Sequence, residues 1–261
     1  MSSENGSCGC FRISVYDGRG FSEKEERIIR EIPLEICLDE RRIITIACAG
    51  IYLEELAVGF LRSEGFLRTQ RDIRAVEVSS DRTQVRIRTV AGREIKGPTA
   101  VTTLGSGGAF GFSRQGMEPP GESLTDRLTF APEELLGLME RFLARARLHE
   151  ETGGTHAAAL ARNGEILIAR EDIGRHNTID MLGGYALLQG LDCRDAVILR
   201  TGRVSSEIVH KIQRLGVQVF CSLSVPTTQA VEMAREAGMT LIGSARRGRM
   251  KIYSGEGRVR M

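Results

Sequence analysis

The alternation of apolar and polar positions predicts a small α+β unit in the first third of the chain. Two apolar runs separated by a polar turn in residues 33–48 predict a β-hairpin. Apolar residues at helical spacing over 52–61 predict a helix, and two further strands are expected at 76–78 and 85–90. We therefore expect a small α+β domain over residues 31–95, similar to a β-grasp roll.

The second half of the chain alternates helical and extended patterns. Helices are expected at 132–148, 178–189, 207–215 and 227–237, and strands at 156–161, 165–169, 196–199, 217–221 and 240–242. This alternation predicts an α/β sandwich over residues 131–261.

Two segments lack such periodicity. Residues 1–30 are polar and are interpreted as a flexible N-terminal tail. Residues 96–130 are rich in glycine and proline, which interrupt regular elements. Because a loop of this length inside a compact protein is usually functional or disordered, we interpret 96–130 as a linker and candidate active loop.

Composition narrows the classes of protein that fit this pattern. Of the 261 residues 41% are hydrophobic, and 36 Lys and Arg against 34 Asp and Glu give a net charge of +2. This near balance argues against a nucleic-acid or membrane-surface protein, and the 5% aromatic content offers few stacking platforms for RNA. The absence of a signal peptide, of a long apolar run and of a C-x-x-C spacing predicts a cytoplasmic protein without a zinc site.

Three predicted strands of the second half end in short turns rich in Ser, Thr, Gly and Arg. At the carboxyl ends of parallel strands, helix N-termini and arginine forks bind anions, so we expect a nucleotide or pyrophosphate ligand if the strands run in parallel. The alternative is that the serines cap helices and the arginines are solvated. The turns contribute Arg200, Thr201, Gly202, Arg203, Ser205, Ser206, Ser224, Thr227, Ser244, Ala245, Arg246, Arg247, Gly248 and Arg249.

A fourth polar turn follows the strand that ends at Ala169. Asp172, Arg175, His176 and Asn177 surround a single glycine there. Such a concentration of polar groups favours a binding site. A well-capped turn, with Asn177 or the next threonine as the N-cap, explains the same residues equally well.

The six cysteines differ in their predicted surroundings. Cys37, Cys48 and Cys221 lie in apolar strand patterns and are expected to be buried and inert. Cys193 follows Asp192 in a loop, where it is interpreted either as an incidental exposed cysteine or as a thiol whose pKa the neighbouring arginine lowers. Cys8 and Cys10 form a closely spaced C-x-C pair on the expected tail.

Four blocks, at residues 152–156, 171–177, 201–207 and 224–227, resemble in order and spacing the signature blocks of the FdhD/NarQ family. The resemblance begins near residue 32. It implies an accessory protein of formate dehydrogenase that takes persulfide sulfur from a cysteine desulfurase and transfers it to the molybdenum bis(molybdopterin guanine dinucleotide) cofactor. It also implies a fold similar to cytidine deaminase without the zinc, and a homodimer.

The match to the family differs between its cofactor-binding stretch and its cysteine element. The cofactor-binding stretch of the family falls on residues 244–249, where a guanine nucleotide such as GDP or GTP would mimic the cofactor. The C-G-x-C-G element of the family is matched within residues 105–111, in which Ser106 and Ala109 occupy the two cysteine positions. Because a hydroxyl cannot hold a persulfide, two hypotheses remain open. Either Cys8 or Cys10 replaces the missing thiol, or the chain is a non-catalytic cofactor chaperone or guanine-nucleotide-binding module.

Overall fold

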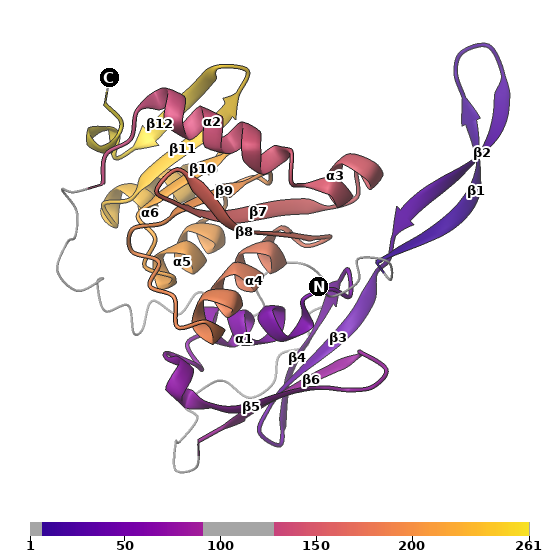
Figure 1. Cartoon of the computed structure of the whole chain (residues 1–261), viewed down its shortest axis with the longest axis horizontal. Helices are drawn as coiled ribbons and strands as arrows, with labels where there is room; N and C mark the ends of the chain where they lie inside the picture. Colours follow the sequence, from indigo (N-terminus) through magenta and orange to yellow (C-terminus); the bar gives the residue numbers. More distant parts are fainter. Residues whose placement is uncertain (1–6, 91–127, 261) are drawn as a thin grey trace.

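A four-stranded sheet and a six-stranded sheet enclose a layer of helices in the computed structural model (Figure 1). The structure describes residues 7–90 and 128–260. Ser106, Ala109 and nearly all of the expected 96–130 loop lie outside the described residues.

The smaller sheet is built from the predicted hairpin, helix and strand pair. Its strands lie in the order β4-β3-β6-β5, with β3 and β6 parallel and the outer pairs antiparallel. The helix α1 packs its apolar face onto this sheet, which buries Leu53, Leu56 and Phe60 in one core cluster. The elements are β3 (Ile32–Leu38), β4 (Arg41–Cys48), α1 (Leu53–Ser63), the 3-10 turn η2 (Gln70–Asp72), β5 (Ile73–Val78) and β6 (Gln84–Thr89).

The larger sheet has the order β12-β11-β10-β9-β7-β8. The strands β9, β10 and β11 are parallel, whereas β7 runs antiparallel to both of its neighbours, so β8 points the same way as β9. The elements are α2 (Pro132–Leu143), α3 (Arg147–Thr152), β7 (His156–Arg162), β8 (Glu165–Asp172), α4 (Arg175–Leu188), β9 (Val197–Arg200), α5 (Ser206–Arg214), β10 (Val219–Ser222), α6 (Thr228–Glu236), β11 (Thr240–Arg246), β12 (Arg249–Ser254) and the 3-10 turn η3 (Glu256–Arg258).

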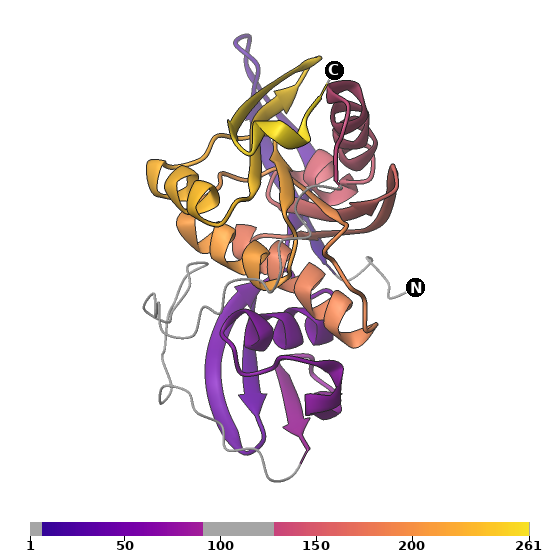
Figure 2. The same cartoon turned by 90° about the vertical axis from the view of Figure 1, so that its left-hand side faces the viewer.

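Helices cover both faces of the larger sheet. The helices α4, α5 and α6 form one core with the sheet, and α2 forms a second core on the opposite face. Helix α4 lies between the two sheets and packs directly on α1 (Figure 2). Two glycines permit this close crossing, because a Cβ on Gly59 would lie 1.7 Å from the carbonyl oxygen of Asp180, and one on Gly184 would lie 1.8 Å from that of Glu55.

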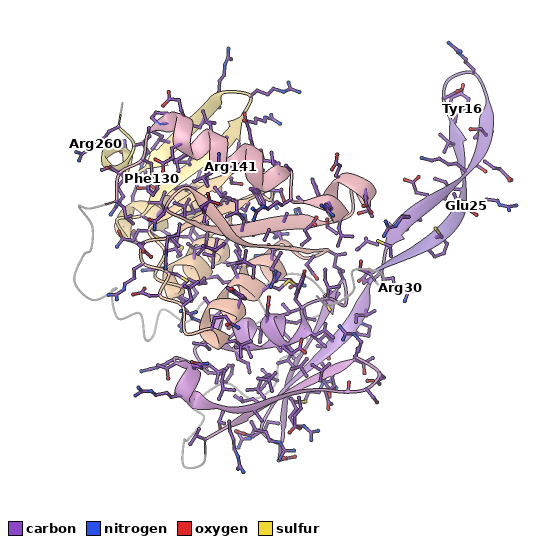
Figure 3. The ribbon with its side chains drawn as sticks, in the orientation of Figure 1. Tyr16, Glu25, Arg30, Phe130, Arg141 and Arg260 are labelled. Carbon is purple, nitrogen blue, oxygen red and sulfur yellow. The ribbon has the colours of Figure 1, made fainter. Side chains whose placement is uncertain are left out.

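The N-terminal segment differs from the expected flexible tail. Residues 8–29 form instead a two-stranded antiparallel hairpin of β1 (Cys8–Tyr16) and β2 (Phe21–Ile29). The carboxylate of Asp17 accepts the backbone N–H groups of Arg19 and Gly20 and thereby fixes the turn. The hairpin stands away from the body, with Tyr16 near its tip and Arg30 at its base (Figure 3).

Two element boundaries in the second half also differ from the expectation. The single helix predicted over 132–148 is divided into α2 and α3, because the buried carboxylate of Glu171 accepts the N–H groups of Leu148 and His149 at the start of the second helix. The strand predicted at 240–242 continues to Arg246 and turns back into β12, which the sequence analysis missed. Residues 244–249 are therefore part of a hairpin.

Candidate functional site

The sheet topology brings the polar turns of the second half to one edge. The strands β8, β9, β10 and β11 all end there, and the antiparallel strand β7 begins there. In register, Arg200 lies between Ala158 and Ser222, and His156 lies opposite Asp172. The parallel arrangement that the anion-site hypothesis required is thus present.

Hydrogen bonds join the separate turns into one continuous surface. The hydroxyl of Ser222 donates to the carbonyl of Gly202 over 2.8 Å. The N–H of Thr227 donates to the carbonyl of Val204 over 2.9 Å, and the N–H of Ser244 donates to the carbonyl of Ser224 over 3.0 Å. The turns after β9, β10 and β11 therefore hold one another in place.

The most unusual group at this edge is the guanidinium of Arg200. Only 1% of Arg200 is exposed, and its Nε and Nη1 atoms have no hydrogen-bond partner among the described residues. Burial, with a further contribution from the charge of Arg175, lowers the pKa of Arg200 to about 9. A buried cation without a counter-ion is costly. This arrangement is typical of a side chain that awaits an anion.

Arg200 lies in a crowded cluster around Gly202. A Cβ on this glycine would lie 3.0 Å from Nη2 of Arg200, 3.3 Å from Cβ of Arg175 and 3.3 Å from Nδ1 of His156. Burial, followed by the charges of Arg200 and Arg175, lowers the pKa of His156. The imidazole is therefore neutral at pH 7 and can form hydrogen bonds without adding a third positive charge.

Two further polar groups at the same edge have no hydrogen-bond partner among the described residues. The Nε atom of Arg175 and the hydroxyl of Ser205 are buried and unpaired within the described residues. Neither α4 nor α5 has a side-chain cap at its N-terminus, whereas the hydroxyl of Thr227 caps α6 by accepting the N–H of Ala230. Uncapped helix N-termini favour anions. We define the arginine edge as His156, Arg175, Arg200, Gly202 and Ser205.

Asp172 and Asn177 brace the arginine edge. The Asp172 carboxylate accepts the N–H groups of Ala49 and Gly174, each over 2.8 Å, and the side-chain amide of Asn177 over 2.6 Å. Burial raises the pKa of Asp172 to about 6, although these hydrogen bonds act in the opposite direction. Asn177 also donates to the carbonyl of Ala47. Gly174, rather than Asn177 or the threonine after it, occupies the N-cap position of α4.

Two other predicted residues join neighbouring elements. The His176 Nε2 atom lies 2.9 Å from a carboxylate oxygen of Glu207 and links the starts of α4 and α5. The Thr201 hydroxyl accepts the N–H of Ala157 over 3.0 Å. These contacts position the arginine edge. The donors at this edge that have no described partner belong to Arg175, Arg200 and Ser205.

The predicted stretch at 244–249 lies on the hairpin between β11 and β12. Ala245 is buried, and Ser244 (φ 53°) has left-handed backbone geometry. Arg247 (φ 52°) and Gly248 (φ 69°) form the two-residue turn, as expected for a tight β-hairpin. The exposed side chains are those of Arg246, Arg247 and Arg249, together with Arg203 on the turn after β9, while Ser206 and Ser224 are half-buried.

The structure separates residues that the sequence analysis treated as equivalent. Arg200 and Arg203 both belong to the turn after β9, but only Arg200 is buried. His156 was not among the predicted site residues, although it is part of the arginine edge. The sequence holds one clue to Arg200, because it directly closes the wholly apolar run 197–199 of a buried strand.

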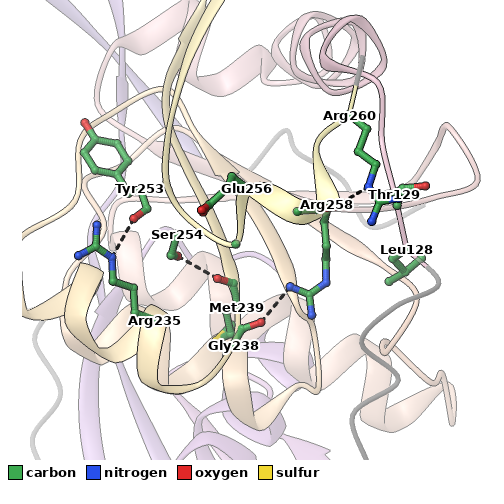
Figure 4. Close-up of a pocket in the computed structure, with 12 residues that line it drawn as sticks. Leu128, Thr129, Arg235, Gly238, Met239, Tyr253, Ser254, Glu256, Arg258 and Arg260 are labelled. Carbon is green, nitrogen blue, oxygen red and sulfur yellow. Dashed lines mark hydrogen bonds between the residues drawn. The ribbon is translucent and has the colours of Figure 1, made fainter.

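A cavity of about 590 Å³ lies at the opposite edge of the sheet, where β11 begins and β12 ends (Figure 4). Its arginines are held by carbonyl oxygens. Arg235 Nε donates to Tyr253, Arg258 Nη1 to Gly238 and Arg260 Nε to Gly257. These hydrogen bonds satisfy some of the N–H groups of each guanidinium. Arg200, being fully buried with two unpaired nitrogens, is the stronger indication of a ligand site.

Residues 7–90 and 128–260 give no indication of a metal site or of a membrane span. Within these ranges, no three His, Cys, Asp or Glu side chains gather as a metal-binding group. No helix in the same ranges is long and apolar enough to cross a bilayer.

Comparison with known proteins places these features in a family. The model of the FdhD/NarQ family matches residues 29–260. A protein from Halalkalibacterium halodurans named sulfur carrier protein FdhD is 36% identical over 251 residues, which cover 93% of this chain and 91% of that protein. A protein of the same name from Bacillus subtilis is 32% identical, covering 94% of this chain and 95% of that one.

The fold is similar to that of a solved structure. A formate dehydrogenase accessory protein from Desulfotalea psychrophila superposes with a TM-score of 0.78 over 97% of this chain and 99% of that one. The two sequences are 23% identical, so this likeness establishes the fold.

Proposed function

The chain belongs to the FdhD/NarQ family, and from that premise we propose that it binds the molybdenum bis(molybdopterin guanine dinucleotide) cofactor as cargo at the arginine edge. In this proposal the chain receives sulfur from a cysteine desulfurase and transfers it to the cofactor for formate dehydrogenase. The relatives named sulfur carrier protein support the sulfur-handling role. The observation that supports the binding site is the buried guanidinium of Arg200, whose Nε and Nη1 atoms have no described hydrogen-bond partner.

The donor set of the arginine edge suits a diphosphate. Two guanidinium groups, one hydroxyl and two uncapped helix N-termini offer hydrogen bonds and positive charge to phosphate oxygens. When a diphosphate accepts hydrogen bonds from Arg175 and Arg200, it supplies the counter-charge that neither side chain finds among the described residues. The neutral His156 lies beside both arginines and can orient a phosphate or a ribose hydroxyl.

The exposed arginines at the β11–β12 turn extend the same electrostatic surface. Arg246, Arg247 and Arg249 have no described ion-pair partner, so they are free to contact the outer part of a large anionic cargo. In this proposal the arginine edge fixes one diphosphate, and the hairpin contacts the remainder of the cargo. Arg203 lies exposed on the turn after β9 and belongs to the outer group.

A non-catalytic cofactor chaperone or guanine-nucleotide-binding module is the second candidate function. The observation that favours it is the pair Ser106 and Ala109, which stand where the family carries cysteines. A serine hydroxyl cannot carry sulfur as a persulfide. Both candidate functions require the same anion site, so binding and sulfur transfer must be measured separately.

Calorimetric titration with GDP tests the binding site. We expect the wild-type chain to bind GDP and the Arg200→Met variant to bind it at least tenfold more weakly, because a buried charge-assisted contact is removed. The Arg247→Ala variant tests the outer group and should show a smaller loss. The Arg260→Ala variant is the matched control, since it removes one arginine from the cavity at the opposite edge of the sheet. Unchanged binding by Arg200→Met, or a loss confined to Arg260→Ala, would overturn the arginine-edge assignment.

The proposal includes a cytoplasmic location and a homodimer. We also propose that the smaller sheet with α1 is a β-grasp unit and that the larger sheet with its helices is related to the cytidine deaminase sandwich. The strand order β4-β3-β6-β5 with a central parallel pair supports the first assignment, and the three-layered arrangement of the larger domain supports the second.

A further inference from the structure

Four of the six cysteines are unsuited to carry sulfur. Cys37, Cys48, Cys193 and Cys221 are buried. Burial raises the pKa of all four thiols, and it raises those of Cys48 and Cys221 to about 12. Both interpretations of Cys193, as an incidental exposed cysteine and as a thiol with a lowered pKa, are therefore wrong, because only 2% of Cys193 is exposed and burial raises its pKa. Since the thiolate is the form that attacks a persulfide, these side chains cannot take part.

The remaining two cysteines lie together on β1. All six cysteines of the sequence fall within the described residues, so Cys8 and Cys10 are the accessible thiols of this chain. Cys10 is exposed and Cys8 is half-buried. Because they are two residues apart on an extended strand, their side chains project from the same face. Pairing of Cys8 with Ile29 and of Cys10 with Arg27 holds them in the hairpin.

Cys8 lies close to the turn that leads into the arginine edge. It packs with Ile29 and Ile173 on an apolar cluster of Ala49, Ile51 and Leu148. Ile173 is joined through Gly174 to Arg175. Ile29 also touches Gly154, because a Cβ there would lie 2.8 Å from the Ile29 side chain, and Gly154 lies just before His156. The hairpin base thus joins the C-x-C pair to two segments of the proposed cofactor site.

We propose that Cys10 and Cys8 form the sulfur relay of this chain. The inference rests on the proposed sulfur-carrying function and identifies the residues that replace the missing loop cysteines. The exposed Cys10 accepts sulfur, and the half-buried Cys8, which is nearer to the arginine edge, releases it. The unpaired buried Arg200 at that edge indicates where the acceptor lies.

The two steps balance in atoms and electrons. The Cys10 thiolate attacks the outer sulfur of a donor persulfide, so a new S–S bond forms on Cys10 and the donor leaves as a thiolate. The Cys8 thiolate then attacks the inner sulfur of the Cys10 persulfide and forms a Cys8–Cys10 disulfide. The outer sulfur departs as sulfide with the bonding electron pair, and the two thiols are oxidised by two electrons. A dithiol reductant restores the pair.

The disulfide requires β1 to bend locally between the two cysteines, where Gly9 gives the backbone the necessary freedom. Side chains two apart on one face of an extended strand have Cβ atoms roughly 6.6 to 6.8 Å apart, whereas a disulfide joins Cβ atoms roughly 3.5 to 4.5 Å apart. Such a bond is strained and therefore easily reduced, which suits a relay that must be regenerated.

Persulfide loading tests the relay. The wild-type chain and the variants Cys8→Ser, Cys10→Ser and Cys8→Ser/Cys10→Ser are incubated with glutathione persulfide, and added sulfur is located by mass spectrometry of alkylated peptides. We expect wild-type protein to release sulfide and to form the Cys8–Cys10 disulfide. We expect Cys8→Ser to retain the persulfide on Cys10, and Cys10→Ser to load at least tenfold less sulfur. The Cys193→Ala variant is the control and should behave as wild type.

GDP titration of the same variants separates the relay from the proposed function. We expect Cys8→Ser/Cys10→Ser to bind GDP as wild type does, which also shows that it is folded. Sulfur that remains on another cysteine in this double variant would refute the relay and leave the sulfur-carrying function intact. Wild-type protein that binds GDP but takes up no sulfur would refute both the relay and the sulfur transfer, and would favour the chaperone function.

Discussion

Arg175 and Arg200 pack against the same glycine, Gly202, and neither guanidinium has an ion-pair partner in the part of the chain that the structure describes. Two like charges held close together, one of them buried, reduce the stability of the free protein. A ligand that carries the opposite charge recovers this free energy on binding. In the proposed function, stability and binding therefore oppose each other at the arginine edge.

Replacement of Arg200 by methionine should stabilise the protein while weakening GDP binding. The methionine side chain fills similar space without a buried charge, so we expect the free energy of unfolding to rise by about 1 to 3 kcal/mol. Chemical denaturation measures this change. The Arg203→Met variant is the control, because Arg203 is exposed on the same turn and its loss should change stability by less than about 0.5 kcal/mol. A marked loss of stability in Arg200→Met would show that Arg200 has a structural partner.

Substitution of either glycine at the crossing of α1 and α4 should be severely destabilising. The Cβ of Gly59→Ala or Gly184→Ala would overlap a backbone carbonyl of the facing helix, which cannot move aside as a side chain can. We expect a loss of more than about 3 kcal/mol in the free energy of unfolding, as measured by denaturant titration.

Gly137 provides the matched control for these substitutions. It lies within helix α2, where a Cβ would meet only the flexible end of Arg141 at 3.3 Å. Because alanine has a higher helix propensity, Gly137→Ala should raise stability by up to about 1 kcal/mol. Equal effects of Gly59→Ala and Gly137→Ala would contradict the close helix crossing.

The sequence predicted the elements whose burial follows a simple period. In β3, the alternating residues Leu34, Ile36 and Leu38 are buried, and in α1 the apolar residues at helical spacing are buried. Both predicted elements were confirmed. The β1–β2 hairpin was missed because it packs on little else, so its sequence needs no apolar period. Glu23, Lys24, Glu25 and Glu26 follow one another in β2 without any alternation.

The chemistry of the candidate site was only partly predictable. The rule that ligands bind at the carboxyl ends of parallel strands pointed to the edge where the polar turns meet, because it depends on topology that alternating patterns suggest. The rule could not distinguish Arg200 from Arg203, since burial of Arg200 depends on the packing of β7, α4 and the next turn around it. His156 was omitted for the same reason, because its distance from Arg200 arises from antiparallel pairing of β7 with β9.

The buried ion pair between Lys211 and Asp180 should show strong energetic coupling. The Lys211 Nζ atom lies 2.7 Å from both carboxylate oxygens, and Ser63 donates a further hydrogen bond to Asp180. Lys211→Met leaves a buried carboxylate without its counter-charge, so we expect a loss of about 3 to 5 kcal/mol in the free energy of unfolding. Lys211→Met/Asp180→Asn removes that charge and should recover at least half of the loss. Strictly additive effects in this double-mutant cycle would contradict the coupling.

Protonation of His210 should weaken the fold as the pH falls. The Nε2 atom of His210 accepts a hydrogen bond from Nε of Arg214 over 3.0 Å. Burial, followed by the charges of Arg214 and Lys211, lowers the pKa of His210 to about 4. The unfolded state therefore binds more protons than the folded state between about pH 6.5 and pH 4. The stability that His210 contributes is present above pH 6.5 and is lost as the pH falls towards 4.

The His210→Gln variant isolates this effect from the other titrating groups. Glutamine can still accept a hydrogen bond from Arg214 but does not titrate, so the variant should lose less stability than wild type between pH 7 and pH 5. Denaturant unfolding at several pH values measures the difference between the two proteins, which cancels the shared contribution of His156. We expect the difference to grow steadily as the pH is lowered. Parallel stability curves would mean that His210 binds protons equally in the folded and unfolded states.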